Sequence, residues 1–377
     1  MKSFRKSLQT YSIITLITLG ILETVFQVVQ LKFLHQYEGL EHLYNISNRE
    51  TYENAACDSG WWKWRFVQRY EAGKGLIKDD SLHRPHPSRG WTPQANLSVK
   101  INGNQYTTNS QGQRDLEDYQ PNPDQYTVLI VGNSYTFGLD TDDSFVWPTL
   151  LENLDSRLNV INLGVSGYGL DQIYITLKET LQQYPPDLVI VAFISDDIFR
   201  MRFDFRDYKK PKLKIQNGQL KITNVPIKGL EQTYKEIKNE LVWYDIPILK
   251  LDNVISNLKI SCQEVSYQLA SKVFRAMQRI TKENNAAFLL TYLASFQEVE
   301  TPDHISYGEK VFKQFVQEEK VAYLNTRPFF LARNQEGENY QGGHYQEAEA
   351  RLVSQQVYQK IQNLPSWQNF LETRKGF

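Results

Sequence analysis

The stretch "TVLIVGNSYTFGLD", residues 127–140, decides the fold. Its first five residues are apolar or β-branched and end at Gly132, which is typical of a buried parallel strand that runs into a tight turn. The turn would place the hydroxyl of Ser134 at the carboxyl end of the strand, where open α/β sheets bind their ligands. The same residues also fit a simple turn in which Asn133 or Ser134 only caps the next helix. The rest of the chain has to decide between these two interpretations.

The remaining sequence repeats the pattern of a strand followed by a helix. Four further apolar segments predict strands: "LNVINLGV" at 158–165, "PDLVIVAFI" at 186–194, "AAFLLTYLA" at 286–294 and "VAYLN" at 321–325. Amphipathic helical patterns lie between them, and the strongest covers 266–285. Such alternation predicts a parallel, doubly wound sheet. Two β-hairpins are predicted around the Asn-Gly turns at 102–103 and 217–218.

The composition fits a globular chain and excludes several classes of protein. With 377 residues, 41% hydrophobic and 23% charged, the chain can bury a core. A net charge of −1 without a long basic block gives no indication of a nucleic-acid partner. Cys57 and Cys262 are the two cysteines, and neither lies in a CxxC pair, so we predict no metal site and no cofactor. They could form one disulfide if the protein lies outside the cytoplasm.

The N-terminus predicts a membrane anchor. Lys2, Arg5 and Lys6 precede a mostly apolar segment, Tyr11–Leu31, which is about the length that crosses a bilayer and is interrupted by Glu23. No small-residue cleavage site follows, so an uncleaved signal anchor is favoured over a cleaved signal peptide. An amphipathic or buried helix is the alternative. The positive residues keep the N-terminus in the cytoplasm, and the main domain would then be periplasmic or otherwise extracytoplasmic.

These features divide the chain into four parts. Residues 1–32 form the cytoplasmic N-terminal region and the transmembrane helix. Residues 33–124 form a helical or irregular linker with a β-hairpin lead-in. Residues 125–365 form the α/β domain, with an insertion at about 203–262, and residues 366–377 form a C-terminal tail. The aromatic cluster "WWKW" in the linker is interpreted as a packing segment.

Four residues at strand ends and loops are candidates for chemistry. Ser134, Gly167 and Asp196 follow the first three strands of the domain, and His344 precedes its last helix. Because the carboxyl ends of parallel strands share one edge, these groups can converge. His344 could take the proton of the Ser134 hydroxyl, and the backbone N–H groups of Ser134 and Gly167 could stabilise an oxyanion. As alternatives, His344 could cap the last helix, and Gly167 could serve the turn alone.

The sequence resembles the SGNH (GDSL-type) hydrolase superfamily. The resemblance covers about residues 125–360 and rests on four segments in order: "GNSYTFG", "NLGVSGYG", "FISDDI" and "GGHYQEAEARL". It implies a flavodoxin-like three-layer α/β/α sandwich with a parallel sheet. It also implies ester hydrolysis or acyl transfer by Ser134 and His344, with Gly167 in the oxyanion hole. The predicted anchor, the "TTNSQGQRD" lead-in and the inserted hairpin resemble a membrane-anchored branch of the bacterial envelope.

Three positions depart from the superfamily pattern. Asn133 replaces the usual Asp beside the serine, which is a mild change because Asn also caps helices well. Asp196 replaces the Asn of the oxyanion hole, and an ionised carboxylate would repel an oxyanion. Asp196 could instead form an ion pair with Arg200 or Arg202.

The third departure concerns the acid that orients the histidine. The superfamily has an Asp two or three residues before the histidine, where this chain has Gln341 and Gly342. A backbone carbonyl or an acid such as Glu338 would have to orient His344 instead.

Two functions remain open. The first is a serine esterase or O-acyltransferase that acts on an ester, with acetyl as the expected acyl group, of an envelope or exported glycan through an acyl-enzyme. The second is a catalytically impaired protein of the same fold that binds a glycan or a partner protein. A metal phosphoesterase built from Asp196, Asp197 and His344 lacks the spacing of a metal site. Geometry discriminates between the first two, because an enzyme needs His344 Nε2 within about 3 Å of Ser134 Oγ.

Overall fold

The structure is a computed structural model that describes residues 14–15, 17–22, 60–73, 82–240, 261–340 and 342–374. The chain forms two compact units. The larger, called here the α/β unit, takes in positions 79–204, 209–227 and 261–377, and the smaller takes in 1–78, 205–208 and 228–260. The α/β unit therefore begins well before position 125, where the sequence predicts the start of the domain.

Two predictions fall largely on residues outside the described ones. The predicted anchor, Tyr11–Leu31, is described only at 14–15 and 17–22, which are helical. No helix within the described ranges is both long and apolar enough to cross a membrane. Cys57 and the side chain of Cys262 also lie outside the described residues, so the pairing of these two cysteines stays a prediction.

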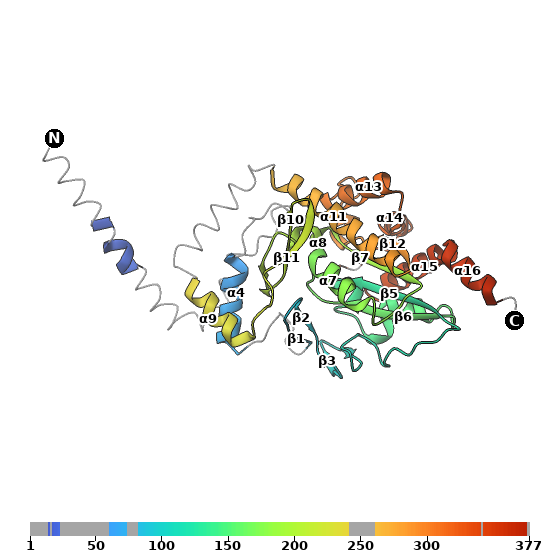
Figure 1. The fold of residues 1–377 in the computed structure, drawn as a ribbon, viewed down its shortest axis with the longest axis horizontal. Coiled ribbons are helices and arrows are strands. Elements are labelled where there is room, and N and C mark those ends of the chain that lie inside the picture. The colour runs from blue at the N-terminus through green and yellow to red at the C-terminus, as the bar shows by residue number, and fades with distance from the viewer. Residues whose placement is uncertain are drawn as a thin grey trace. The chain divides into compact units, whose positions relative to one another are not determined.

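A five-stranded parallel sheet forms the centre of the α/β unit (Figure 1). Its strands are β5 (Tyr126–Gly132), β6 (Leu158–Gly164), β7 (Leu188–Phe193), β12 (Ala287–Tyr292) and β13 (Ala322–Asn325). They lie in the order β13-β12-β7-β5-β6. This is the flavodoxin-like order. The order of the strands reverses beside β5, the first strand of the sheet, and such a reversal opens a crevice at the carboxyl end of the strand. The predicted parallel α/β fold is confirmed.

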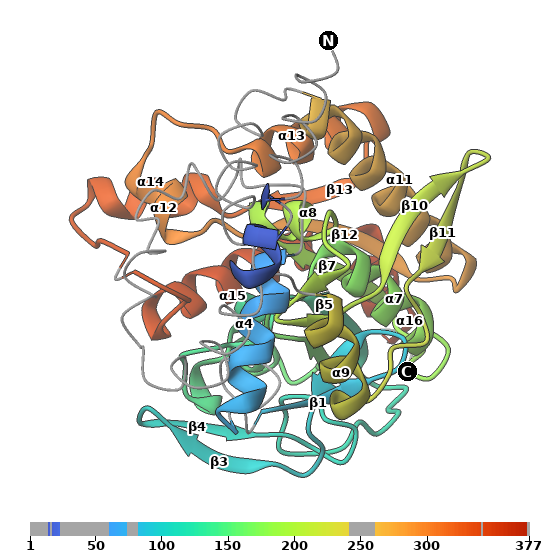
Figure 2. The same cartoon turned by 90° about the vertical axis from the view of Figure 1, so that its left-hand side faces the viewer.

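Helices cover both faces of the sheet (Figure 2). On one face, β5 side chains such as Val128 and Ile130 join a core with residues of the C-terminal helices, among them Val353 and Trp367. On the other face, Phe193 of β7 packs against Phe274 with ring centroids 4.9 Å apart. The helices are α5 (Ser134–Phe137), α6 (Trp147–Glu152), α7 (Leu170–Thr180), α8 (Ser195–Arg200), α11 (Ser261–Glu283), α12 (Phe296–Glu300), α13 (Tyr307–Glu319), α14 (Arg327–Gln335), α15 (Glu347–Gln362) and α16 (Pro365–Arg374), with a 3₁₀ turn, η2 (Asp143–Phe145).

The C-terminal segment differs from the predicted tail at 366–377. Residues Pro365–Arg374 form helix α16, which begins with a proline. Its Trp367 is buried, and the ring lies edge-on to Tyr126 with centroids 5.1 Å apart. The segment therefore belongs to the core beneath β5.

The lead-in segment from residue 82 to β5 also packs as part of the α/β unit. It holds β1 (His83–His86), β2 (Gly90–Pro93), β3 (Ser98–Ile101) and β4 (Asn104–Thr107). The β3–β4 hairpin turns at Asn102 and Gly103, both with positive φ, as a type I′ turn requires. Its Tyr106 joins Leu82 and Phe137 in a small core. Phe137 lies three residues after Ser134, so the lead-in packs directly on the candidate site.

The second predicted hairpin is confirmed as β10 (Lys212–Gln216) and β11 (Gln219–Thr223), with positive φ at Asn217 and Gly218. Strands β8 (Phe205–Arg206) and β9 (Tyr208–Lys209) are two residues long.

In the smaller unit, helices α4 (Gly60–Glu71) and α9 (Leu230–Glu240) pack together, and Phe66 of α4 contacts Phe205 and Tyr208.

Candidate active site

Two glycines shape the turn that carries Ser134. Gly132 ends β5 and pairs with Gly164, the last residue of β6. A Cβ on Gly132 would lie 2.2 Å from Thr136 Oγ1, and one on Gly164 would lie 2.4 Å from the Phe137 nitrogen. Only glycine therefore lets helix α5 fold back across the two strand ends. This close turn puts Ser134 at the carboxyl edge of the sheet.

Asn133, and not Ser134, is the capping residue of this turn. Its Oδ1 accepts a hydrogen bond from the Tyr135 N–H at 2.8 Å, and its Nδ2 donates to Asp197 Oδ2 at 2.5 Å. Asp197 is fully buried and also accepts from the Ile194 N–H and from Arg200 Nη1. Burial raises the pKa of Asp197 to about 7, while the charge of Arg200 and these hydrogen bonds act in the opposite direction. The cap that the sequence analysis offered to Asn133 or Ser134 is thus formed by Asn133.

Ser134 and His344 meet in the geometry of a nucleophile and its general base. His344 Nε2 lies 2.9 Å from Ser134 Oγ, although 210 positions separate the two residues in the sequence. Ser134 is 5% exposed, and the His344 ring lies 4.9 Å from the ring of Tyr135. This is the distance that the sequence analysis set as the mark of an enzyme.

Asp140 lies where an acid that orients His344 would stand, and the sequence analysis did not find it. Its Oδ2 lies 2.7 Å from His344 Nδ1, on the far side of the ring from Ser134. A carboxylate there favours the tautomer with the proton on Nδ1, which leaves the Nε2 lone pair facing the serine hydroxyl. Glu338, which the sequence offered for this role, pairs with Arg333 at 2.5 Å. Ser134, His344 and Asp140 thus form a Ser-His-Asp constellation.

The backbone on both sides of the candidate histidine is held by hydroxyl groups. The carbonyl of Gly343 accepts hydrogen bonds from the hydroxyls of Tyr135 and Tyr340, both at 3.2 Å. The carbonyl of Tyr345 accepts one from Thr141 Oγ1 at 2.5 Å. Tyr135 and Thr141 belong to the segment around Ser134 and Asp140. The same segment therefore also holds the backbone beside His344.

Gly167 lies in the turn between β6 and α7, with φ of +80°. The lead-in holds this turn from outside, because Trp91 Nε1 donates to the Ser166 carbonyl at 2.8 Å and the Tyr168 hydroxyl donates back to the Trp91 carbonyl. The turn follows β6, the strand beside β5, and a glycine lets a substrate approach its backbone closely. A role of Gly167 in an oxyanion hole stays a prediction.

Asp196 sits in the first turn of α8 with about half of its side chain exposed. Its Oδ2 lies 3.6 Å from Arg200 Nη2, which is one of the two ion pairs that the sequence offered as its structural role. The other arginine, Arg202, lies over the ring of Phe199 at 4.9 Å. Among the described residues, no three His, Cys, Asp or Glu side chains are arranged so that they could hold a metal ion.

No protein-family profile and no curated protein matches the chain. Lipolytic proteins of the G-D-S-L family and esterases recur among the solved structures to which it is similar. A G-D-S-L lipolytic family member from Veillonella parvula shares 11% identity over 63% of this chain and 100% of its own, with a TM-score of 0.41.

Two esterases are similar to the same extent. A psychrotrophic esterase from Pseudoalteromonas sp. shares 14% identity over 65% of this chain and 100% of its own, with a TM-score of 0.39. A catalytic mutant of an acetylxylan esterase from Geobacillus stearothermophilus shares 14% identity over 62% and 93%, with a TM-score of 0.39.

Proposed function

We propose that this chain is a serine hydrolase or acyltransferase that acts on ester bonds. The observation that carries the proposal is the continuous contact from Ser134 Oγ to His344 Nε2 at 2.9 Å and from His344 Nδ1 to Asp140 Oδ2 at 2.7 Å. A serine hydroxyl is a weak nucleophile until a base takes its proton. Here the base stands at hydrogen-bond distance and the acid orients the base.

The reaction proceeds in two halves. Ser134 Oγ bonds to the acyl carbon while its proton passes to His344 Nε2, and the carbonyl oxygen becomes an oxyanion. The intermediate then collapses, the bond to the leaving alcohol breaks, and His344 returns the proton to that alcohol. In the second half His344 takes a proton from water or from a sugar hydroxyl, whose oxygen attacks the acyl carbon of the acyl-enzyme. The bond between this carbon and Ser134 Oγ then breaks, and His344 Nε2 returns the proton to Ser134 Oγ.

The oxyanion would be stabilised by backbone donors. The N–H groups of Ser134 and Gly167 are the candidates, since both residues follow adjacent strands at one edge of the sheet. The contact of Asp196 with Arg200 supports a structural role for this carboxylate rather than a place in the oxyanion hole. In the proposed mechanism the Asp196 side chain therefore donates no hydrogen bond to the oxyanion.

For the substrate, we propose an acetyl ester of an envelope or exported glycan. The resemblance of the sequence motifs and the anchor predicted at Tyr11–Leu31 support this class. The site is also open among the described residues, because 54% of the Asp140 side chain and 23% of the His344 side chain are exposed. An open edge suits a bulky acyl carrier. The anchor itself is tested by asking whether alkaline carbonate leaves the chain in the membrane fraction.

The experiment that tests the proposed function is turnover of p-nitrophenyl acetate by the full-length chain in detergent, beside Ser134→Ala and Asp196→Asn. Turnover that Ser134→Ala abolishes supports the serine enzyme. Turnover that survives Ser134→Ala contradicts it. A silent wild type that gains activity in Asp196→Asn would favour the second candidate, a protein of this fold that binds a glycan or partner, because Asp196 would then be what suppresses catalysis.

A further inference from the structure

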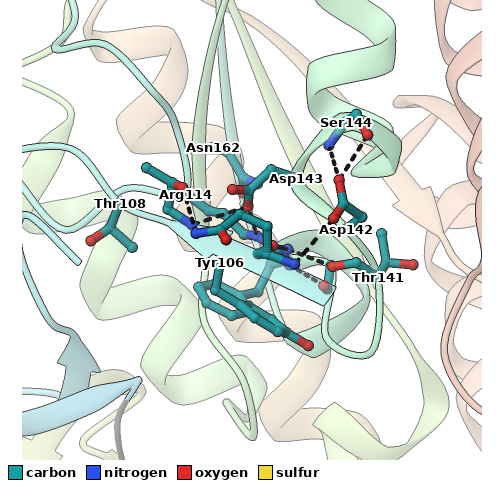
Figure 3. Close-up of polar contacts among 12 residues, drawn as sticks. Tyr106, Thr108, Arg114, Thr141, Asp142, Asp143, Ser144 and Asn162 are labelled. Carbon is teal, nitrogen blue, oxygen red and sulfur yellow. Dashed lines mark hydrogen bonds and ion pairs between the residues drawn. The ribbon is translucent and has the colours of Figure 1, made fainter. Parts of the chain in front are cut away.

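Arg114 is a buried cation in the lead-in segment, seven residues after β4. It is 3% exposed, and its Nε donates to Asp143 Oδ1 at 2.9 Å (Figure 3). Burial lowers the pKa of Arg114, whereas Asp143 raises it. A buried arginine costs free energy unless its remaining donors are satisfied, so the partners of the other N–H groups are informative.

Those partners belong mainly to one loop. Nη1 donates to the carbonyls of Phe137, at 3.1 Å, and Gly138, and Nη2 donates to the carbonyl of Thr141 at 2.5 Å. Nη2 also reaches the carbonyl of Gln105 in β4 at 3.0 Å. These three carbonyls, from the end of α5 and the loop after it, lie just before and just after Asp140. The planar guanidinium therefore spans the loop that presents the acid, which one ammonium group could not do equally well.

Tyr106 holds the same loop from its N–H side. The Asp140 N–H donates to the Tyr106 hydroxyl at 2.9 Å, and the Arg114 guanidinium lies over the Tyr106 ring at 4.2 Å. Asp140 has a left-handed backbone with φ of +62°, which aspartate adopts more readily than most non-glycine residues but at a cost that its surroundings have to offset. Arg114 and Tyr106 together supply such surroundings.

The loop and the hairpin bind each other reciprocally. Asp142 Oδ2 accepts from the Gln105 N–H, and Asp143 Oδ1 accepts from the Thr107 N–H, both at 3.1 Å. Backbone donors of β4 are thus paired with loop carboxylates, and loop carbonyls are paired with Arg114. A shift of the hairpin would be transmitted to the loop.

We infer that Arg114, with Tyr106, is a positioning residue that keeps Asp140 in contact with His344. The inference rests on the proposed serine-hydrolase function and adds to it a role for the lead-in segment. Arg114 acts through Asp140, so its removal should slow the chemical step and leave substrate binding nearly unchanged.

The test is a double-mutant cycle on the full-length chain, with p-nitrophenyl acetate as the substrate. Arg114→Lys and Tyr106→Phe are each made in the wild type and in Asp140→Ala, and kcat is expressed per folded molecule, from thermal melts followed by circular dichroism. In the wild type we expect kcat to fall about 10-fold for Arg114→Lys and about 3-fold for Tyr106→Phe, with KM within twofold. In Asp140→Ala neither substitution should lower kcat further.

Arg327→Lys is the matched control for loss of a buried guanidinium. Arg327 is 4% exposed, pairs with Glu309 at 3.1 Å, and donates to several backbone carbonyls of residues 298–304. It should lower the melting temperature and leave kcat per folded molecule within twofold. Tyr106→Phe keeps the ring that packs on Phe137, so it provides a folded variant if Arg114→Lys does not fold.

The outcomes separate this inference from the function on which it rests. Equal losses of kcat in both backgrounds, or no loss in the wild type, would overturn the positioning role while Ser134→Ala still abolished turnover. If Ser134→Ala had no effect on turnover, or the wild type had none to lose, the proposed function would fail and the positioning role with it.

Discussion

Asn133 Nδ2 donates a 2.5 Å hydrogen bond to Asp197 Oδ2, inside the core and one residue away from Ser134. This contact explains the asparagine at a position where the SGNH superfamily usually has Asp. An aspartate would still cap the turn, but it would face the buried carboxylate of Asp197. The asparagine thus supplies the donor that the buried carboxylate of Asp197 accepts.

The first prediction is that Asn133→Asp destabilises the protein although it restores the usual superfamily residue. Two buried carboxylates would stand at hydrogen-bond distance, which costs about 3 kcal/mol of unfolding free energy. Asn133→Ser, which keeps the cap and loses the amide donor, should cost about 1 kcal/mol. Urea unfolding of the two variants measures the difference. Equal stability of Asn133→Asp and the wild type would contradict the role assigned to this contact.

The second prediction concerns the pH dependence of stability. Burial raises the pKa of Asp197 from 3.8 to about 7, so between these pH values the folded state binds more protons than the unfolded state. Its contribution therefore lowers stability as pH rises from about 4 to about 7 and is constant above that. Asp197→Asn should remove this part of the slope. The check is the urea midpoint of the wild type and of Asp197→Asn, each at about pH 5 and about pH 8. If the midpoint changed by the same amount between these pH values in both proteins, the prediction would be wrong.

The third prediction is that Asp140→Asn lowers kcat about 10²- to 10⁴-fold with little change in KM. An amide favours the wrong tautomer of His344 and cannot stabilise the imidazolium that forms during attack. Glu338→Gln is the control, because Glu338 pairs with Arg333 and should tolerate the change within twofold. Steady-state kinetics on p-nitrophenyl acetate measure both. A reversed ranking of the two variants would reassign the acid.

The fourth prediction compares two glycines with similar backbone conformations. Gly138 has φ of +78°, and a Cβ there would lie 2.8 Å from Val146 Cγ2 and 3.0 Å from Arg114 Nη1. Gly218 has φ of +75° with nothing within 4 Å of such a Cβ. Gly218→Ala should therefore cost only the conformational penalty of about 1 kcal/mol and leave activity intact. Gly138→Ala should cost more and also lower kcat.

Thermal melts and kinetics on the two alanine variants decide this prediction. If Gly138→Ala lost no more stability and activity than Gly218→Ala, the close approach of Arg114 to the loop would not matter for the site.

The strands could be predicted because their signal is local. The apolar runs that became β5, β6, β7, β12 and β13 are continuous and bounded by turn residues, as both-face burial in a parallel sheet requires. The Asn-Gly hairpins were predictable for the same reason.

The candidate site was only half predictable. Ser134 and His344 lie in recognisable segments, but the contact of Asp140 with His344 joins positions 204 apart, and periodicity carries no such information. The one local signal was Gly138-Leu139-Asp140, because aspartate is among the few residues that adopt a left-handed backbone readily. The sequence predicts a linker at the lead-in because the segment is rich in polar residues and glycine, while the burial of Arg114 and Tyr106 leaves no mark in composition.

Ser134, at the start of α5, and Asp140, in the loop that follows, are six positions apart, and His344 comes 204 positions after Asp140. During synthesis, Ser134 and Asp140 therefore exist together long before His344, the proposed base. A ribosome-bound or truncated chain that stops before His344 would be chemically silent. Under the proposed mechanism, turnover would report on the docking of the C-terminal segment, and an ester probe would distinguish a chain that contains His344 from one that stops before it.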